Sequence, residues 1–178
     1  MVGRGFTLGE GDMERIIGAL VAIALAILAV GNTLSNSGQA KSDQKSGGAA
    51  TDIGYVMTKA RAGFAQSNTG FANFSNANLG GLINGGTFPP TMVKSGGIFD
   101  KWGNPITLSS ANSGTSGVIS FGGGGSQTTD ECTSTVTSLS GYDLLTVGGQ
   151  SFTRSNMPDT SQAGAVCSAT ATIVVTFH

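Results

Sequence analysis

Few side chains in this chain could carry out acid–base or metal chemistry. His178 is the single histidine and the last residue of the sequence, so a Ser-His-Asp or Cys-His site would depend on a frayed terminus. Cys132 and Cys167 with one terminal histidine leave a zinc site without a fourth ligand and without the usual spacing. We therefore expect no enzyme, no metal site and no cofactor.

Two further motifs that could bind ligands have simpler structural interpretations. Gly122–Gly125 is a glycine run without the Gly-Lys-Ser/Thr ending of a phosphate-binding loop, and it predicts a flexible turn. Asp130 and Glu131 could contact calcium. At a predicted helix start, however, acidic side chains more often interact with the positive end of the helix dipole.

The composition is more typical of a secreted or cell-surface protein than of a cytosolic enzyme. Charged residues make up 11% of the chain, 29 residues are glycine, and the formal net charge is −1. Nucleic-acid binding requires a basic stripe, which the sequence lacks. In an oxidising compartment Cys132 and Cys167 would form one disulfide, whereas the alternative is two unrelated buried thiols.

The block 16–30 is entirely apolar. As a helix it would be about 22 Å long, or about 28 Å if it continues to Leu34, and a membrane core is about 30 Å thick. This block has three possible interpretations: a cleaved secretory signal, a permanent membrane anchor, or a stem that passes from the membrane into a filament. Signal peptides begin with positive charge, whereas the 15 residues before this block contain three acidic and two basic side chains. This composition argues against a signal peptide and leaves the anchor and the stem open.

The elements that follow alternate between helical and extended patterns. Residues 35–50 are polar and small, which indicates a weak helix or a linker, and Gly47-Gly48 could kink or break it. A helix is expected from a cap at Thr51 or Asp52, with apolar side chains at helical spacing. These side chains are Ile53, Val56, Met57, Ala60 and Phe64.

The remaining sequence predicts mostly strands. The last, 170–177, is rich in β-branched residues with an apolar centre, so it should lie centrally in a sheet. Trp102 is expected in the core. A helix followed by antiparallel strands predicts an α+β fold with the helix on one sheet face. The other expected elements are helices at 76–83 and 129–139 and strands at 106–108, 118–121, 144–147 and 150–153.

The start of the chain resembles a known kind of subunit. Gly5-Phe6-Thr7-Leu8-Gly9-Glu10, followed by the apolar block, resembles the prepilin-peptidase site and stem of type IV pilins. Cleavage between Gly5 and Phe6 places Glu10 fifth, as the family pattern requires. Cleavage after Gly9 would place Glu14 fifth instead. The resemblance implies the type IV pilin fold and three parts: a leader at 1–5, a helical stem at 6–50 with its apolar part at 16–34, and a globular head at 51–178.

The stem resemblance also implies a mode of assembly. Many copies of the helix would pack side by side, and Glu10 or Glu14 of one copy would pair with the α-amino group of its neighbour. In a water-poor core an unpaired carboxylate is costly. Small side chains at helical spacing would allow the helices to approach closely. The stem provides Gly18, Ala22, Ala26 and Ala29.

The later sequence is similar to type IVb pilins of the PilS kind. The similarity lies in Phe-Pro-Pro-Thr-Met-Val at 88–93, Ile-Phe-Asp-Lys-Trp-Gly-Asn at 98–104, Gly-Tyr-Asp-Leu-Leu-Thr-Val at 141–147, and the final cysteine and strand. It implies a disulfide-bounded region, Cys132 to Cys167, on the outer face of a filament. It also implies thin pili used in adhesion, self-association or conjugation.

The function expected from these resemblances is a major structural subunit that polymerises into a type IVb pilus. The alternatives are a minor pilin or adhesin at the pilus tip and a pseudopilin of a type II secretion system. The expected partners are further copies of the chain, the prepilin peptidase and the inner membrane, with no nucleic acid. The subunit would move from the bacterial inner membrane to an extracellular pilus.

Overall fold

The computed structural model describes residue 41 and the ranges 44–64 and 66–178. Residues 44–64 form one helix, called helix 44–64 below. The further helices are α2 (Leu79–Asn84), α3 (Thr129–Ser138) and α4 (Thr160–Val166), with 3-10 turns η1 (Gly70–Asn73), η2 (Asn76–Asn78) and η3 (Asn112–Gly114). The strands are β1 (Val93–Lys94), β2 (Gly97–Ile98), β3 (Thr107–Ala111), β4 (Ser116–Gly122), β5 (Leu144–Val147), β6 (Gln150–Thr153) and β7 (Thr172–Phe177).

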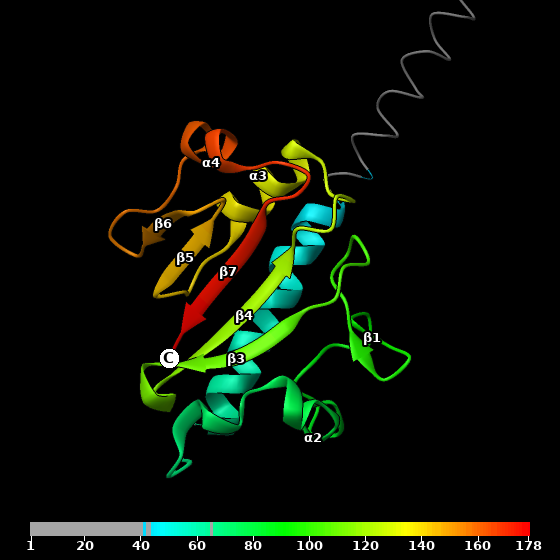
Figure 1. The fold of residues 1–178 in the computed structure, drawn as a ribbon, viewed down its shortest axis with the longest axis vertical. Coiled ribbons are helices and arrows are strands. Elements are labelled where there is room, and N and C mark those ends of the chain that lie inside the picture. Colours follow the sequence, from blue (N-terminus) through cyan, green and yellow to red (C-terminus); the bar gives the residue numbers. More distant parts are fainter. Residues whose placement is uncertain (1–40, 42–43, 65) are drawn as a thin grey trace, which may run out of the picture. The chain divides into compact units, whose positions relative to one another are not determined.

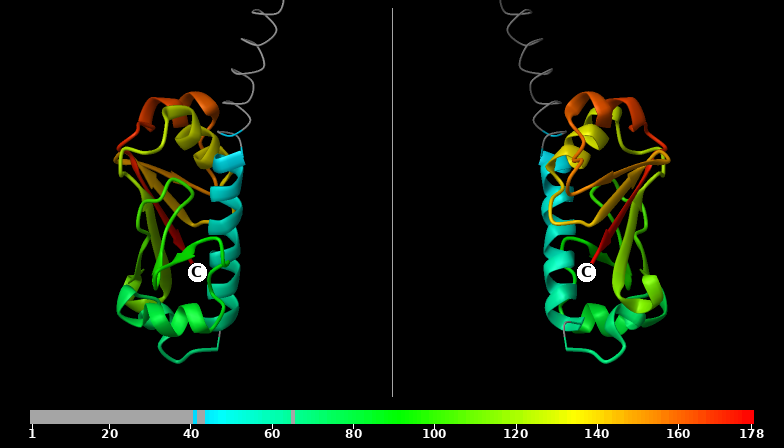
Figure 2. Two further views of the ribbon diagram at one scale, coloured as in Figure 1. Left: turned by 90° about the vertical axis from the view of Figure 1, so that its right-hand side faces the viewer. Right: turned by 90° about the vertical axis from the view of Figure 1, so that its left-hand side faces the viewer.

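Helix 44–64 lies along one face of the main sheet, as the two side views show (Figure 2). Its predicted apolar stripe faces the sheet, and Ile53, Val56, Met57 and Ala60 are each at most 2% exposed. These positions share one side of a helix because they are three or four residues apart. The expected α+β fold, with a helix packed on an antiparallel sheet, is therefore confirmed.

The predicted start of this helix is wrong. Helical structure is already present at residue 44, and it continues through Gly47, Gly48 and Thr51 without a break. Ser46 and Ala49 are only 2% and 3% exposed. Burial of this turn against the rest of the fold outweighs the weak helix propensity of its glycines, because tertiary packing commonly overrides propensity.

The main sheet has five antiparallel strands in the order β3-β4-β7-β5-β6 (Figure 1). The final strand is central, as predicted, since β7 pairs with β4 on one side and with β5 on the other. Ile173, Val175 and Phe177 are fully buried, whereas the alternate side chains of β7 are less buried. This alternation is the period of two that a strand imposes on a sheet with one core face.

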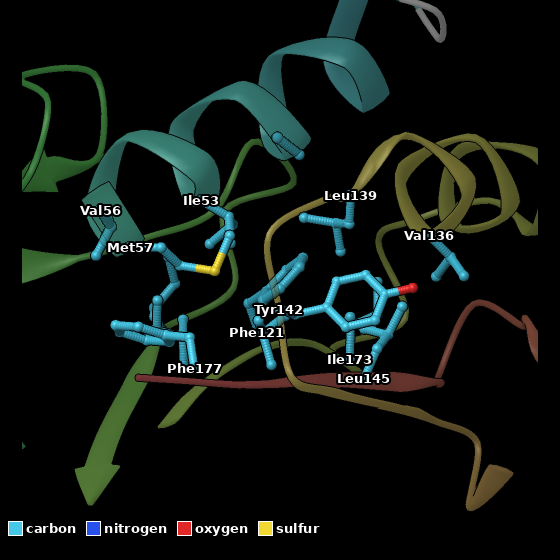
Figure 3. Close-up of a cluster of buried hydrophobic side chains, with 14 of the residues drawn as sticks. Ile53, Val56, Met57, Phe121, Val136, Leu139, Tyr142, Leu145, Ile173 and Phe177 are labelled. Carbon is cyan, nitrogen blue, oxygen red and sulfur yellow. The ribbon is translucent and has the colours of Figure 1, made fainter. Parts of the chain in front are cut away.

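The core fills the space between helix 44–64 and the sheet. Ile53, Val56 and Met57 point from the helix toward side chains of the sheet and of the segment after α3 (Figure 3). The Phe177 ring lies 5.4 Å from the Phe71 ring and 5.6 Å from the Phe74 ring, both edge to face. Such aromatic pairs add about 0.5–1.5 kcal/mol each beyond the area that they bury.

The segment around Trp102 is held by one buried carboxylate. Asp100 accepts hydrogen bonds from the backbone N–H groups of Trp102, Asn104 and Gly122, at 2.8–2.9 Å. These bonds join the segment to the end of β4. Trp102 is 8% exposed, so its predicted place in the core is confirmed.

The glycine run after β4 lies close to a neighbouring side chain. A Cβ on Gly124 would lie 1.9 Å from Oδ1 of Asn104, so a larger residue at position 124 would force that side chain to move. The sequence predicted a flexible turn here, and the run lies in an irregular connection in which Gly124 closely approaches the Asn104 side chain.

Candidate functional site: the disulfide-bounded region

The disulfide-bounded region, residues 132–167, contains most of α3, the hairpin β5–β6 and α4. Cys132 near the start of α3 is bonded to Cys167, which directly follows α4, and their Cα atoms are 5.6 Å apart. Both side chains are buried. The predicted disulfide is therefore confirmed, and it joins the two helices at the same end of the sheet (Figure 1).

Both helices of this region begin with a capping box. The Thr128 hydroxyl accepts from the Glu131 backbone N–H at 3.1 Å, and the Glu131 carboxylate accepts from the Thr128 N–H at 2.9 Å. In α4, Asp159 and Gln162 exchange the same pair of bonds at 2.8 and 3.2 Å. Each box satisfies two N–H groups that a helix start leaves unpaired. Glu131 thus acts at the helix start, as its sequence position predicted.

The hairpin β5–β6 packs tightly against the end of α4. Its two-residue turn, Gly148-Gly149, has φ values of 55° and 87°, in the left-handed region that favours glycine. A Cβ on Gly148 would lie 2.5 Å from the carbonyl oxygen of Val166. The turn therefore contacts the last residue of α4 at a distance that a side chain at Gly148 would prevent.

A cluster of polar contacts holds the opposite end of β5. The Asp143 carboxylate accepts from Nη2 of Arg154 at 2.8 Å and lies 2.6 Å from Nδ1 of His178. Nε of Arg61, on helix 44–64, donates to the His178 carbonyl at 2.6 Å, and Nη2 of Arg61 donates to the Gly141 carbonyl. The cluster links the helix, the end of β7 and the start of β5.

His178 differs from the expectation of a frayed terminus, because its backbone and its ring both have partners. The His178 ring contacts the Asp143 carboxylate, which also binds Arg154, so the contact between His178 and Asp143 links the end of β7 to the start of β5.

Within the ranges that the structure describes, no group of three or more His, Cys, Asp or Glu side chains could hold a metal ion.

Among the described residues, Tyr142, next to Asp143, is the titratable group whose pKa departs clearly from its ordinary value. Burial raises the pKa of its phenol, because a buried phenolate would lose its hydration. The side chain lies among Val136, Leu139 and Leu145 (Figure 3). Its hydroxyl has no hydrogen-bond partner within the described part of the chain. Tyr142 therefore belongs to the core of this region.

The assembly residues predicted from the sequence lie outside the described residues. Among the described residues, no helix has the length and hydropathy needed to cross a membrane. The pairing of glutamates and the packing of the stem thus stay predictions. The residues concerned are Gly5, Phe6, Glu10, Glu14, Gly18, Ala22, Ala26 and Ala29.

Sequence reasoning missed α4, although the sequence contains a signal for it. Asp159-Thr160-Ser161-Gln162 has a capping residue followed three positions later by glutamine, which is the pattern of a capping box. The helix has only seven residues, including Gly164, and of these only Ala163 is buried. Its apolar periodicity is consequently too weak to reveal it.

Comparisons with known proteins give the family. The family model described as PilS N terminal matches residues 32–178, which is more than half of the chain. The crystal structure of a type IVb pilin from Salmonella typhi has a similar fold, with a TM-score of 0.54, 18% sequence identity and coverage of 74% of this chain and 99% of that chain. No curated protein matches the sequence. The chain belongs to the PilS N-terminal family and is a type IVb pilin, a subunit of a pilus.

Proposed function

We propose that this pilin polymerises into a type IVb pilus through an apolar N-terminal helix. The observation that carries the proposal is the family match over 32–178, which covers the whole α+β head with its disulfide. The apolar block 16–30 precedes that match and supplies a segment able to pack in a water-poor filament core. The chain thereby acts as a structural subunit, and no catalytic step is part of the proposal.

Assembly would begin in the inner membrane. The prepilin peptidase cuts between Gly5 and Phe6, which removes the leader 1–5 and frees the α-amino group of Phe6. Glu10 of one copy then pairs with that amine on its neighbour. The pair sets the register of the stems, because an unpaired carboxylate or amine inside the filament core would be strongly destabilising. Gly18, Ala22, Ala26 and Ala29 let neighbouring stems approach closely.

The head, residues 51–178, remains outside the stem core in this proposal. The disulfide-bounded region faces outward, where it takes part in adhesion, self-association or conjugation. Its construction supports this role: the turn after β5 packs against Val166, next to the disulfide, and the cluster around Asp143 holds the other end of β5. A surface element that must survive outside the cell benefits from cross-linking in an oxidising environment.

The decisive experiment compares Glu10→Ala with Glu14→Ala in cells that otherwise lack the subunit. Sheared pili and membrane-held subunit are quantified separately by immunoblot. We expect Glu10→Ala to abolish pili while membrane-held subunit persists, and Glu14→Ala to leave piliation unchanged. Normal piliation in the Glu10 variant would refute its role.

Two measurements on purified filaments separate the alternatives. Mass spectrometry of the mature N-terminus identifies the cleavage site and any N-methylation. The proposal requires Phe6 as the first residue and this chain as the main component of the filament. A trace amount of the chain in otherwise normal pili would indicate a minor pilin at the tip.

A further inference from the structure

A hollow of about 230 Å³ lies between β6 and α4, within the disulfide-bounded region. These two elements meet at the edge of the sheet that is farther from helix α2 (Figure 1). The lining side chains come from the hairpin, from the segment that follows it and from the helix. They are Gln150, Phe152, Asn156, Gln162, Ala165 and Val166.

The walls of this hollow are held in place by three separate features. The Gly148 turn contacts the Val166 carbonyl, which sets the distance between the hairpin and α4. The disulfide fixes Cys167, the residue after Val166. The capping box of Asp159 and Gln162 fixes the other end of α4. A hollow with fixed walls requires little ordering when a ligand binds, which favours binding.

The lining combines neutral amides with an apolar floor. Gln150, Asn156 and Gln162 provide amide groups, each with donors and an acceptor, and none of the six lining residues is charged. Phe152 is 2% exposed and forms part of the floor. The Oε1 atom of Gln162 accepts a hydrogen bond from the Asp159 N–H, so the NH₂ group of the same side chain can donate to a ligand.

We propose that this hollow binds one neutral sugar ring. A pyranose has hydroxyl groups around its rim, each able to donate and accept, and aliphatic C–H groups on its ring faces. Side-chain amides match the rim, and Ala165 and Val166, with the edge of the buried Phe152 below them, match the ring face. None of the lining residues carries a charge that could pair with an ionised sugar, so a charged sugar would lose part of its hydration and gain no ion pair. The lining therefore favours a neutral sugar over a charged one.

The size of the hollow indicates weak binding by a single chain. Its volume of about 230 Å³ is below the about 300 Å³ at which sites for larger ligands begin. We expect a dissociation constant of about 1 mM. If the proposed polymerisation holds, a filament presents many such sites, and the avidity for a surface glycan rises accordingly. The binding to one chain does not depend on polymerisation.

Saturation-transfer difference NMR on the full chain tests the proposal. The protein is kept in a phosphocholine detergent, which carries no sugar. The probes are glucose, galactose, mannose, N-acetylglucosamine and N-acetylgalactosamine, with glucuronic acid as a charged sugar and capped triglycine as a neutral peptide. We expect signals from at least one neutral sugar and none from the other two probes.

Three variants locate the binding. Ala165→Leu fills the hollow, and Gln162→Glu keeps the acceptor for the Asp159 N–H while it removes the amide donor and adds charge. Both should weaken sugar binding about tenfold or more. Gln66→Ala, which removes an exposed glutamine outside the hollow, serves as the matched control and should bind as the wild type does.

Each result decides the proposal. Loss of the sugar signal in Ala165→Leu and Gln162→Glu, with binding kept in Gln66→Ala, supports it. No signal from any neutral sugar, a signal that survives Ala165→Leu, or binding of glucuronic acid or triglycine alone overturns it. Piliation of the Ala165→Leu strain is measured in parallel, so failure of the sugar site and failure of the polymerisation proposal are distinguishable.

Discussion

Removal of the Cys132–Cys167 disulfide should lower the free energy of unfolding of the head by about 4 kcal/mol. The two cysteines are 35 positions apart in the sequence. Closing a loop of that length removes about 13 cal/mol/K of chain entropy from the unfolded state, which corresponds to about 3.8 kcal/mol at 25 °C. The loop contains β5, β6 and α4, so the unfolded chain without the bond gains freedom over the whole region.

The measurement is urea unfolding of the full chain in detergent, followed by circular dichroism, for the wild type and the Cys132→Ala, Cys167→Ala double variant. With a slope of about 2 kcal/mol per M, the midpoint should fall by about 2 M. Reductant should shift the wild type similarly and leave the double variant unchanged. A midpoint shift below about 0.5 M would refute the loop-entropy reasoning.

Three further predictions concern the packing of the head, and each is tested by the same urea measurement. Gly148→Ala should cost about 1–3 kcal/mol more than Gly149→Ala, since both glycines have positive φ but only a Cβ on Gly148 overlaps the Val166 carbonyl; equal losses would contradict this. Phe177→Ala should cost about 3–5 kcal/mol because its ring is fully buried among other rings, and a loss below about 1 kcal/mol would refute that packing. Tyr142→Phe should leave stability unchanged or raise it by up to about 1 kcal/mol at neutral pH, because the hydroxyl has no partner within the described residues. Burial raises the pKa of Tyr142, so above about pH 10 this tyrosine ionises more readily in the unfolded chain than in the folded one. The free energy of unfolding of the wild type should therefore be unaffected by Tyr142 ionisation below about pH 10 and fall above it, and it should fall less in Tyr142→Phe.

The strands of the main sheet were predictable because local sequence and tertiary structure favour the same conformation there, whereas the short pair β1 and β2 was not predicted. β5 and β6 have the predicted bounds, since Gly148-Gly149 separates two short runs and fits the turn that joins them. The central place of β7 followed from its apolar, β-branched composition. The α+β class followed from the order of these elements.

The details that sequence reasoning missed depend on contacts between distant segments. The first turns of helix 44–64 are held by burial of Ser46 and Ala49, which the local composition does not reveal. The partners of His178 come from Arg61 and Asp143, which are 117 and 35 residues away. The hollow beside α4 forms only when the hairpin β5–β6 and the helix α4 pack together, and the local sequence of neither element reveals that packing.

The central position of β7 has a consequence for how the head folds. Residues 172–177 come last among the elements, yet they pair with both β4 and β5. Until they arrive, two strands of the sheet have exposed edges, and such edges are sites for unwanted pairing between chains. Completion of the sheet also requires closing a long segment between β4 and β7, which slows folding. The growing head is therefore most vulnerable to aggregation just before its last strand is inserted.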